Sequence, residues 1–207
     1  MRPLPRLFAV TTDSICRAAD FGVRAAAIAA SGSAAAILVR APDSTTAQQA
    51  AFAERVTALA RPPEASVFVH ARADLARAVG ADGVQLRGAD LLPADARRVL
   101  GPGWVGRSVH SAEEADAALA DGADYLVAGN VFDTPSHPGY RGRGLTWLAG
   151  IAALGHPVIA IGGITSARAA AARDAGALGV AVIAALWEAN DPAAAAAALL
   201  APWAEAT

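Results

Sequence analysis

The sequence predicts an α/β protein with a single (β/α)8 TIM barrel, one domain over residues 1–207. Short apolar runs, typical of parallel strands buried on both faces, alternate eight times with helix-like segments. Gly or Pro marks each turn from a helix to the next strand. No G-x-G-x-x-G motif follows the first strand, and no shift in composition marks a second domain, so a closed barrel is favoured over an open sheet.

The first half of the chain supplies four of these units. Asp13 or Ser14 is expected to cap a first helix over about Ile15–Ala30, and the loop Pro42-Asp43-Ser44-Thr45 contains the cap of a second that runs to about Leu59. A short third helix covers Ala73–Val79. The strands are expected at Leu7–Thr11, Ala35–Val39, Ser66–Val69 and Gly83–Leu86.

The second half continues the alternation. Pro93 opens the fourth helix as an N1 proline, and Ser111 with Glu114 has capping-box spacing before the fifth. The strands are expected at Trp104–Arg107, Tyr125–Ala128, Val158–Ile161 and Gly179–Ile183. The remaining helices are expected at Leu145–Ala153, Ser166–Ala175 and, after a cap at Asp191, Pro192–Ala204.

Composition narrows the classes of function. A net charge of −2 does not favour nucleic acid or an acidic membrane surface as a partner, and no apolar run is long enough to span a membrane. Cys16 is the one cysteine, which excludes an intrachain disulfide and a thiolate metal cluster. We therefore expect a cytoplasmic protein. All 17 basic residues are Arg, so chemistry that needs a Schiff-base lysine is excluded.

In this fold the active site lies just after the strands, and a phosphate typically lies after strands seven and eight. Gly162 and Gly163, with the start of the strand-eight loop at Ala184, are therefore the predicted phosphate site. The alternative for the glycine pair is a tight turn and nothing more. The longest irregular stretch, Gly129–Arg143, is a candidate lid that carries Arg141 and Arg143.

Polar residues at the other strand ends complete the predicted rim. Arg40 is expected to face the cavity or to pair with a carboxylate, and His110 either takes part in the site or orients the Ser108 loop. His70 is either a cavity residue or a hydrogen-bonding residue of the rim. No group of rim carboxylates and no His pair at i, i+4 is present, so no metal site is predicted.

Several motifs occur in order along nearly the whole chain: L-F-A-V-T-T-D, A-D-L-A-R-A-V-G-A-D-G-V-Q-L, G-R-S-V-H-S-A-E-E-A, G-A-D-Y-L-V-A-G-N-V-F-D-T-P-S-H-P-G, R-G-L and P-V-I-A-I-G-G-I. Together with the Arg after strand two, they resemble one family, thiamine phosphate synthase and its relative TenI, the thiazole tautomerase. The resemblance is specific for the superfamily and less specific for the activity.

The synthase joins a pyrimidine diphosphate to a thiazole phosphate and releases Mg-bound pyrophosphate. Of its Gln-x-Arg-x-Lys motif only Arg40 is present, and His70 begins the segment that replaces Asn-Asp-Arg, so one Mg-binding carboxylate is absent. Asp90 matches the second Mg-binding aspartate and marks a residual Mg position. Ser108 matches the family serine, and His137 stands where a pyrophosphate-binding Lys is expected.

The segments F-D-T-P-S-H-P-G and R-G-L look more like TenI-type proteins. The catalytic His of TenI lies in G-H-V-F, where this chain has Asn130, a residue that positions a substrate but is no base. His70, His110 and His137 are then the candidate proton-transfer groups.

The resemblance implies a TenI-like enzyme of thiamine biosynthesis that acts on a small-molecule thiazole phosphate by proton transfer, without a cofactor. The first alternative is a thiamine phosphate synthase with a degraded Mg site, which would use Mg. The second is a non-catalytic barrel that binds a phosphate or a thiazole. Helices rich in Ala permit self-packing, so a homo-oligomer is left open.

Overall fold

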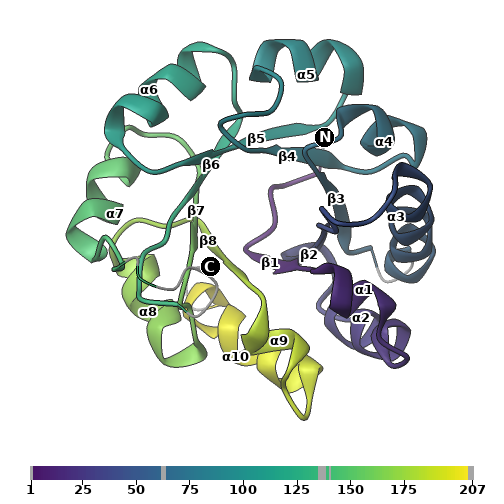
Figure 1. Ribbon diagram of the computed structural model, residues 1–207. Coiled ribbons are helices and arrows are strands. Elements are labelled where there is room, and N and C mark those ends of the chain that lie inside the picture. Colours follow the sequence, from purple (N-terminus) through teal and green to yellow (C-terminus); the bar gives the residue numbers. More distant parts are fainter. Residues whose placement is uncertain (1, 62–63, 135–138, 140, 205–207) are drawn as a thin grey trace.

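The computed structural model describes residues 2–61, 64–134, 139 and 141–204. Its strands close into a parallel barrel in chain order, with the last strand paired to the first (Figure 1). The predicted (β/α)8 fold is therefore confirmed. The strands are β1 (Leu7–Val10), β2 (Ala35–Val39), β3 (Ser66–His70), β4 (Gly83–Leu86), β5 (Trp104–Val109), β6 (Tyr125–Ala128), β7 (Val158–Ile161) and β8 (Gly179–Val182).

Helices form a ring around this barrel (Figure 1). Within the described residues, none of them is long and apolar enough to cross a membrane. They are α1 (Asp13–Arg17), α2 (Phe21–Ala29), the 3-10 helix η1 (Gly32–Ala34), α3 (Thr46–Ala60), α4 (Ala73–Ala78), α5 (Pro93–Leu100), α6 (Ala112–Ala120), α7 (Leu145–Ala152), α8 (Ser166–Asp174), α9 (Ala184–Trp187) and α10 (Pro192–Ala204).

Alternate strand residues separate two cores. One set packs against the helices, and the other fills the barrel itself. Inside the barrel the Phe8 ring lies 4.9 Å from Phe68 and 5.8 Å from Tyr125 between centroids. Leu4 belongs to the same cluster and precedes β1, so it closes the end of the barrel at which the strands begin. A ligand site is thereby restricted to the end at which the strands finish.

Aspartates in two copies of a G-A-D sequence tie neighbouring strands together. The Asp124 carboxylate, just before β6, accepts a 2.7 Å hydrogen bond from Val105 N in β5 and pairs with Arg97. Asp82, just before β4, accepts a 2.8 Å bond from Val67 N in β3. Each carboxylate satisfies a backbone donor at the start of a strand, which helps to set the register of the barrel.

The predicted helix over Ile15–Ala30 is wrong, because the chain breaks into α1 and α2. Ala18 has extended backbone, with ψ of 142°. The break lets the ring of Phe21 stack on Trp187, with centroids 5.6 Å apart. This contact joins α2, near the start of the chain, to α9, near its end. Because the two residues are far apart in sequence, the local sequence pattern does not reveal the contact. The helix cap is Thr12, whose Oγ1 accepts from Ile15 N, and neither Asp13 nor Ser14.

Two further expectations are corrected. Strand β8 ends at Val182 rather than Ile183, and the following apolar residues form the short helix α9. Glu114 makes only half of the predicted capping box. Its backbone N–H donates to Ser111 Oγ, but its carboxylate accepts from the N–H of His110 instead of Ser111.

Candidate functional site

The candidate site is the mouth of the barrel, where the strands end. Residues after β2 to β5 supply one side, and residues after β6 to β8 supply the other. Because each strand is paired in register with the next, these positions, far apart in sequence, lie at one rim. The aromatic rings of the barrel interior form its floor.

Arg40 is held at the rim through its backbone. Thr11, which is fully buried, accepts a 2.8 Å hydrogen bond from Arg40 N and donates one of 3.0 Å to Arg40 O. Cys16 Sγ donates to the same hydroxyl, which explains the one cysteine as a structural residue. Among the described residues, no side chain makes a hydrogen bond or an ion pair with the Arg40 guanidinium, so this cation is available to an anion.

His70 ends β3 and is half-buried beside two cations. The pKa of His70 is lowered to about 4, first by burial and then by the charges of Arg40 and Arg87, while Asp90 opposes them. The imidazole is therefore neutral near pH 7. In that state it offers one donor and one acceptor to a ligand at the mouth.

Asp90 belongs to the same group, but Arg87 occupies its carboxylate. Arg87 N donates to it at 2.7 Å, and Arg87 Nη2 at 2.8 Å. Burial raises the pKa of Asp90, but these bonds from Arg87 outweigh it and hold the pKa below its usual value. In the described part of the chain, no three His, Cys, Asp or Glu side chains gather around a common point. This donor set does not fit a Mg²⁺ site built on side-chain carboxylates.

Ser108 lies within β5, which extends to Val109 rather than ending at Arg107 as predicted. Its Oγ accepts a 3.1 Å hydrogen bond from Gln85 Nε2 in β4. His110 comes just after the strand but is exposed, and its Nδ1 lies 3.0 Å from Glu114 Oε2 at the start of α6. The imidazole of His110 is thus paired with Glu114 of α6, beside the mouth.

The segment that begins with Asn130 runs alongside the end of β7. Val131 N donates to Ile161 O at 2.9 Å, and Phe132 N donates to Gly162 O at 3.0 Å. A Cβ on Gly162 would lie 2.4 Å from Asn130 Cβ, so the glycine is required for this close approach. Gly163 likewise faces the segment, because its own Cβ would lie 2.5 Å from the carbonyl oxygen of Asp133.

The glycine pair also leaves backbone donors at the rim. The N–H groups of Gly163 and Ala184 donate to no residue in the described part of the chain. The N-terminus of α8 lies just beyond Gly163, and Ala184 is the first residue of α9. Free N–H groups beside a helix N-terminus are suited to a phosphate.

The remaining predicted residues lie at the edge of this arrangement. His137 is outside the described residues. Arg141 is exposed, and the Arg143 guanidinium lies 5.4 Å from the centroid of the Trp147 ring. The Arg143 backbone N–H donates to Asn130 O at 2.9 Å, which ties the end of the segment to the end of β6, while its guanidinium is directed at Trp147.

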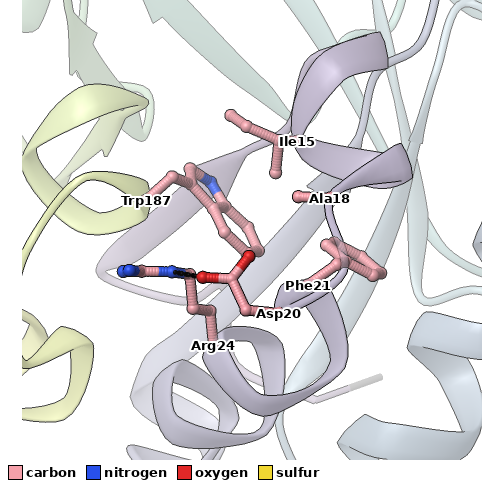
Figure 2. A pocket seen from close by; sticks show the side chains of 6 residues that line it. All are labelled: Ile15, Ala18, Asp20, Phe21, Arg24 and Trp187. Carbon is pink, nitrogen blue, oxygen red and sulfur yellow. Dashed lines mark hydrogen bonds and ion pairs between the residues drawn. The ribbon is translucent and has the colours of Figure 1, made fainter.

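A separate hollow lies beside the barrel, between α1, α2 and α9 (Figure 2). Its volume is about 140 Å³, and it contains none of the predicted site residues. Figure 2 shows the ion pair of Asp20 and Arg24 at its edge and the Trp187 ring across it. The hollow is therefore no part of the mouth. Its lining residues are Ile15, Ala18, Asp20, Phe21, Arg24 and Trp187.

Two residues of the mouth were missed from the sequence. Gln85 is a buried amide inside an otherwise apolar strand, and that contrast was a usable signal. Arg168 lies with its guanidinium 4.7 Å from the Phe132 ring and donates to Gly163 O at 2.7 Å. Its place in an Ala/Arg-rich helix gave no sign that it braces the glycine turn.

Residues 7–186 match the family model TMP-TENI, described as thiamine monophosphate synthase. The chain is 42% identical over 165 residues to a thiamine-phosphate synthase of Thermus thermophilus, covering 79% of this chain and 80% of the relative. It is 47% identical over 178 residues to one of Anaeromyxobacter dehalogenans, covering 84% and 80%.

Among solved structures, the chain is similar to a thiamine phosphate pyrophosphorylase from Pyrococcus furiosus. The TM-score is 0.83 at 36% identity, and the match covers 97% of this chain and 96% of that one. The Thermus and Anaeromyxobacter relatives bear the synthase name, so they favour the synthase alternative over the TenI-like assignment expected from the lid motifs.

Proposed function

The chain belongs to the TMP-TENI family, and we propose that it is the coupling enzyme of that family, joining a pyrimidine diphosphate to a thiazole phosphate. In this reaction the thiazole nitrogen forms a bond to the pyrimidine methylene carbon. The bond from that carbon to the diphosphate breaks, and pyrophosphate leaves with the electron pair.

The observation that carries the proposal is a pair of anion-accepting positions on opposite sides of one mouth. Arg40, with no partner of its own among the described side chains, follows β2. The free N–H groups of Gly163 and Ala184 follow β7 and β8. A reaction between a diphosphate and a phosphate needs two such positions, with the reacting carbon and nitrogen between them.

The cation beside β2 matches the charge that develops during coupling. As the C–O bond breaks, negative charge grows on the leaving pyrophosphate, and a guanidinium that faces it lowers the barrier. Arg40 supplies this charge in a chain without lysine. Because the carboxylates present do not fit a Mg²⁺ site, we assign no step to a metal ion.

The low pKa of His70 also favours coupling over the tautomerase. Aromatising a thiazole carboxylate phosphate requires a base near neutrality, whereas a group with a pKa of about 4 is a weak one. A neutral His70 suits a substrate hydrogen bond. The tautomerase is the second candidate. Arg87 pairs with Asp90 and so takes up the carboxylate that a metal would need, and the tautomerase reaction needs no metal.

The test incubates the purified protein with the pyrimidine diphosphate and the thiazole phosphate, with Mg²⁺ or with EDTA, and measures thiamine phosphate by chromatography. Coupling supports the proposal. A parallel arm follows the ultraviolet change of the thiazole carboxylate phosphate, and turnover there alone would replace the proposal with the tautomerase. Tight binding without turnover in either arm would indicate a binding protein.

Substitutions then separate the roles. His70→Ala and His137→Ala are compared in the ultraviolet arm, where unchanged rates in both would remove them as proton carriers. Arg98→Gln is the control for Arg40→Gln in the coupling arm, because Arg98 is exposed and pairs with Asp95 on its own helix.

A further inference from the structure

Gln85 places an amide inside the barrel, where the neighbouring side chains are apolar. It is 3% exposed and lies on β4, one strand from Ser108 on β5. Gly106 leaves the space that it uses. A Cβ there would lie 2.3 Å from Gln85 Oε1 and 2.1 Å from the Cζ atom of Tyr125. The sequence therefore keeps one strand position without a side chain to make room for this amide.

The amide is only half satisfied. Its Nε2 donates to Ser108 Oγ at 3.1 Å and to Leu86 O at 3.2 Å. The carbonyl of Leu86 accepts only, so the nitrogen must face it, which settles the orientation of the amide. Within the described chain, Gln85 Oε1 and the Tyr125 hydroxyl are buried without a hydrogen-bond partner.

This arrangement does not serve stability. A buried acceptor without a partner is unfavourable, and an apolar side chain of the same size would remove that cost, while the Ser108 hydroxyl, which is only partly buried, can meet water in place of the amide. A residue that lowers stability inside a packed core is expected at a functional position.

The hydrogen bond to Ser108 has a direct chemical consequence. Because Ser108 Oγ accepts from Gln85, the serine cannot use Gln85 as an acceptor, and its own proton must point elsewhere. Ser108 lies near the end of β5, partly open to the mouth. A ligand at the mouth therefore meets this hydroxyl as a donor.

We propose that Gln85 is a positioning residue, which fixes the polarity of the Ser108 hydroxyl so that it donates a hydrogen bond to an acceptor atom of the substrate. The inference rests on the proposed function for the identity of the substrate. It implies that an unprotonated ring nitrogen or an oxygen of the substrate lies next to Ser108 and accepts the hydroxyl proton.

The test is a double-mutant cycle with Gln85→Leu, Ser108→Ala and the double variant, measured as kcat and KM of coupling and as affinity for the thiazole phosphate and the pyrimidine diphosphate by calorimetry. We expect each single variant to lose a similar factor of about 10 to 100 in kcat/KM or in affinity. The double variant should lose no more than either single one.

Unfolding in urea separates positioning from a structural role. Gln85→Leu should unfold at the same or a higher urea concentration than the native protein, and Gln85→Met, a second apolar side chain, should behave alike. Gln48→Leu, the same exchange at an exposed position in the capping box of α3, should leave kcat/KM unchanged.

Three results would overturn the inference. They are full kcat/KM and affinity in Gln85→Leu, a double variant whose loss is the product of the two single losses, or a fall in stability large enough to account for the lost activity. If the native protein binds either substrate but does not couple them, the proposed function fails, and the affinity cycle still decides the role of Gln85.

Discussion

Gly162→Ala is the substitution whose effect the structure defines best. Gly162 has φ of +98°, and an added Cβ would lie 2.4 Å from Asn130 Cβ and 2.7 Å from Asn130 Cα. The left-handed backbone adds about 1–2 kcal/mol. Moving the packed segment that begins at Asn130 adds about 1–3 kcal/mol. We therefore expect a loss of roughly 2–5 kcal/mol in the free energy of unfolding.

The measurement is urea unfolding followed by circular dichroism, with the slope m compared between variants. Gly150→Ala is the matched control. Gly150 lies in α7 and an added Cβ would meet no heavy atom within 4 Å, so this change should stabilise by about 0.5–1 kcal/mol. Affinity for the thiazole phosphate should fall in Gly162→Ala only, because the displaced segment disturbs the N–H of Gly163. A variant of Gly162 with native stability and affinity would refute this reasoning.

Three further outcomes follow from single contacts. Asp124→Ala should lower the free energy of unfolding by about 1–3 kcal/mol, since Val105 N loses its acceptor and Arg97 its partner, as denaturant midpoints would show. Because the pKa of His70 is lowered from 6.5 to about 4, the folded state binds fewer protons than the unfolded chain in that range. Stability should then fall as pH drops from 6.5 towards 4, by up to about 1.4 kcal/mol per pH unit, and His70→Asn should remove this part of the slope. Arg40→Gln should weaken binding of the pyrimidine diphosphate by about tenfold or more in calorimetry while the denaturant midpoint stays within experimental error.

Much of the fold could be read from the chain because a barrel strand is a local pattern. The four-residue run Val158–Ile161 is apolar and ends at two glycines, and the structure has β7 at those bounds. Two of the errors, the unbroken helix through Ala18 and the missing helix after β8, have a different origin. Neither the break at Ala18 nor the helix α9 has a local signal, because both depend on the packing of Phe21 against Trp187.

For the candidate site as well, some features could be predicted from the sequence and others could not. Arg40, His70, Ser108 and Gly162 could be predicted to lie together because polar or glycine residues at the ends of apolar strands fall at one rim by the geometry of the barrel. Their partners were not. Arg87 binding Asp90 joins residues within one loop, yet the geometry of that loop decides whether the carboxylate is free for a metal.

The sequence by itself determined the alternation of strands and helices, the set of residues at the rim and the absence of lysine from any mechanism. The tertiary structure decided the state of those residues. It buried His70 near two cations, so that its pKa is low, and placed one amide beside Ser108, so that the serine hydroxyl accepts from the protein. Charge and hydrogen-bond polarity depend on distances of a few ångströms between strands, and such distances are set by the closure of the barrel rather than by neighbours in the chain.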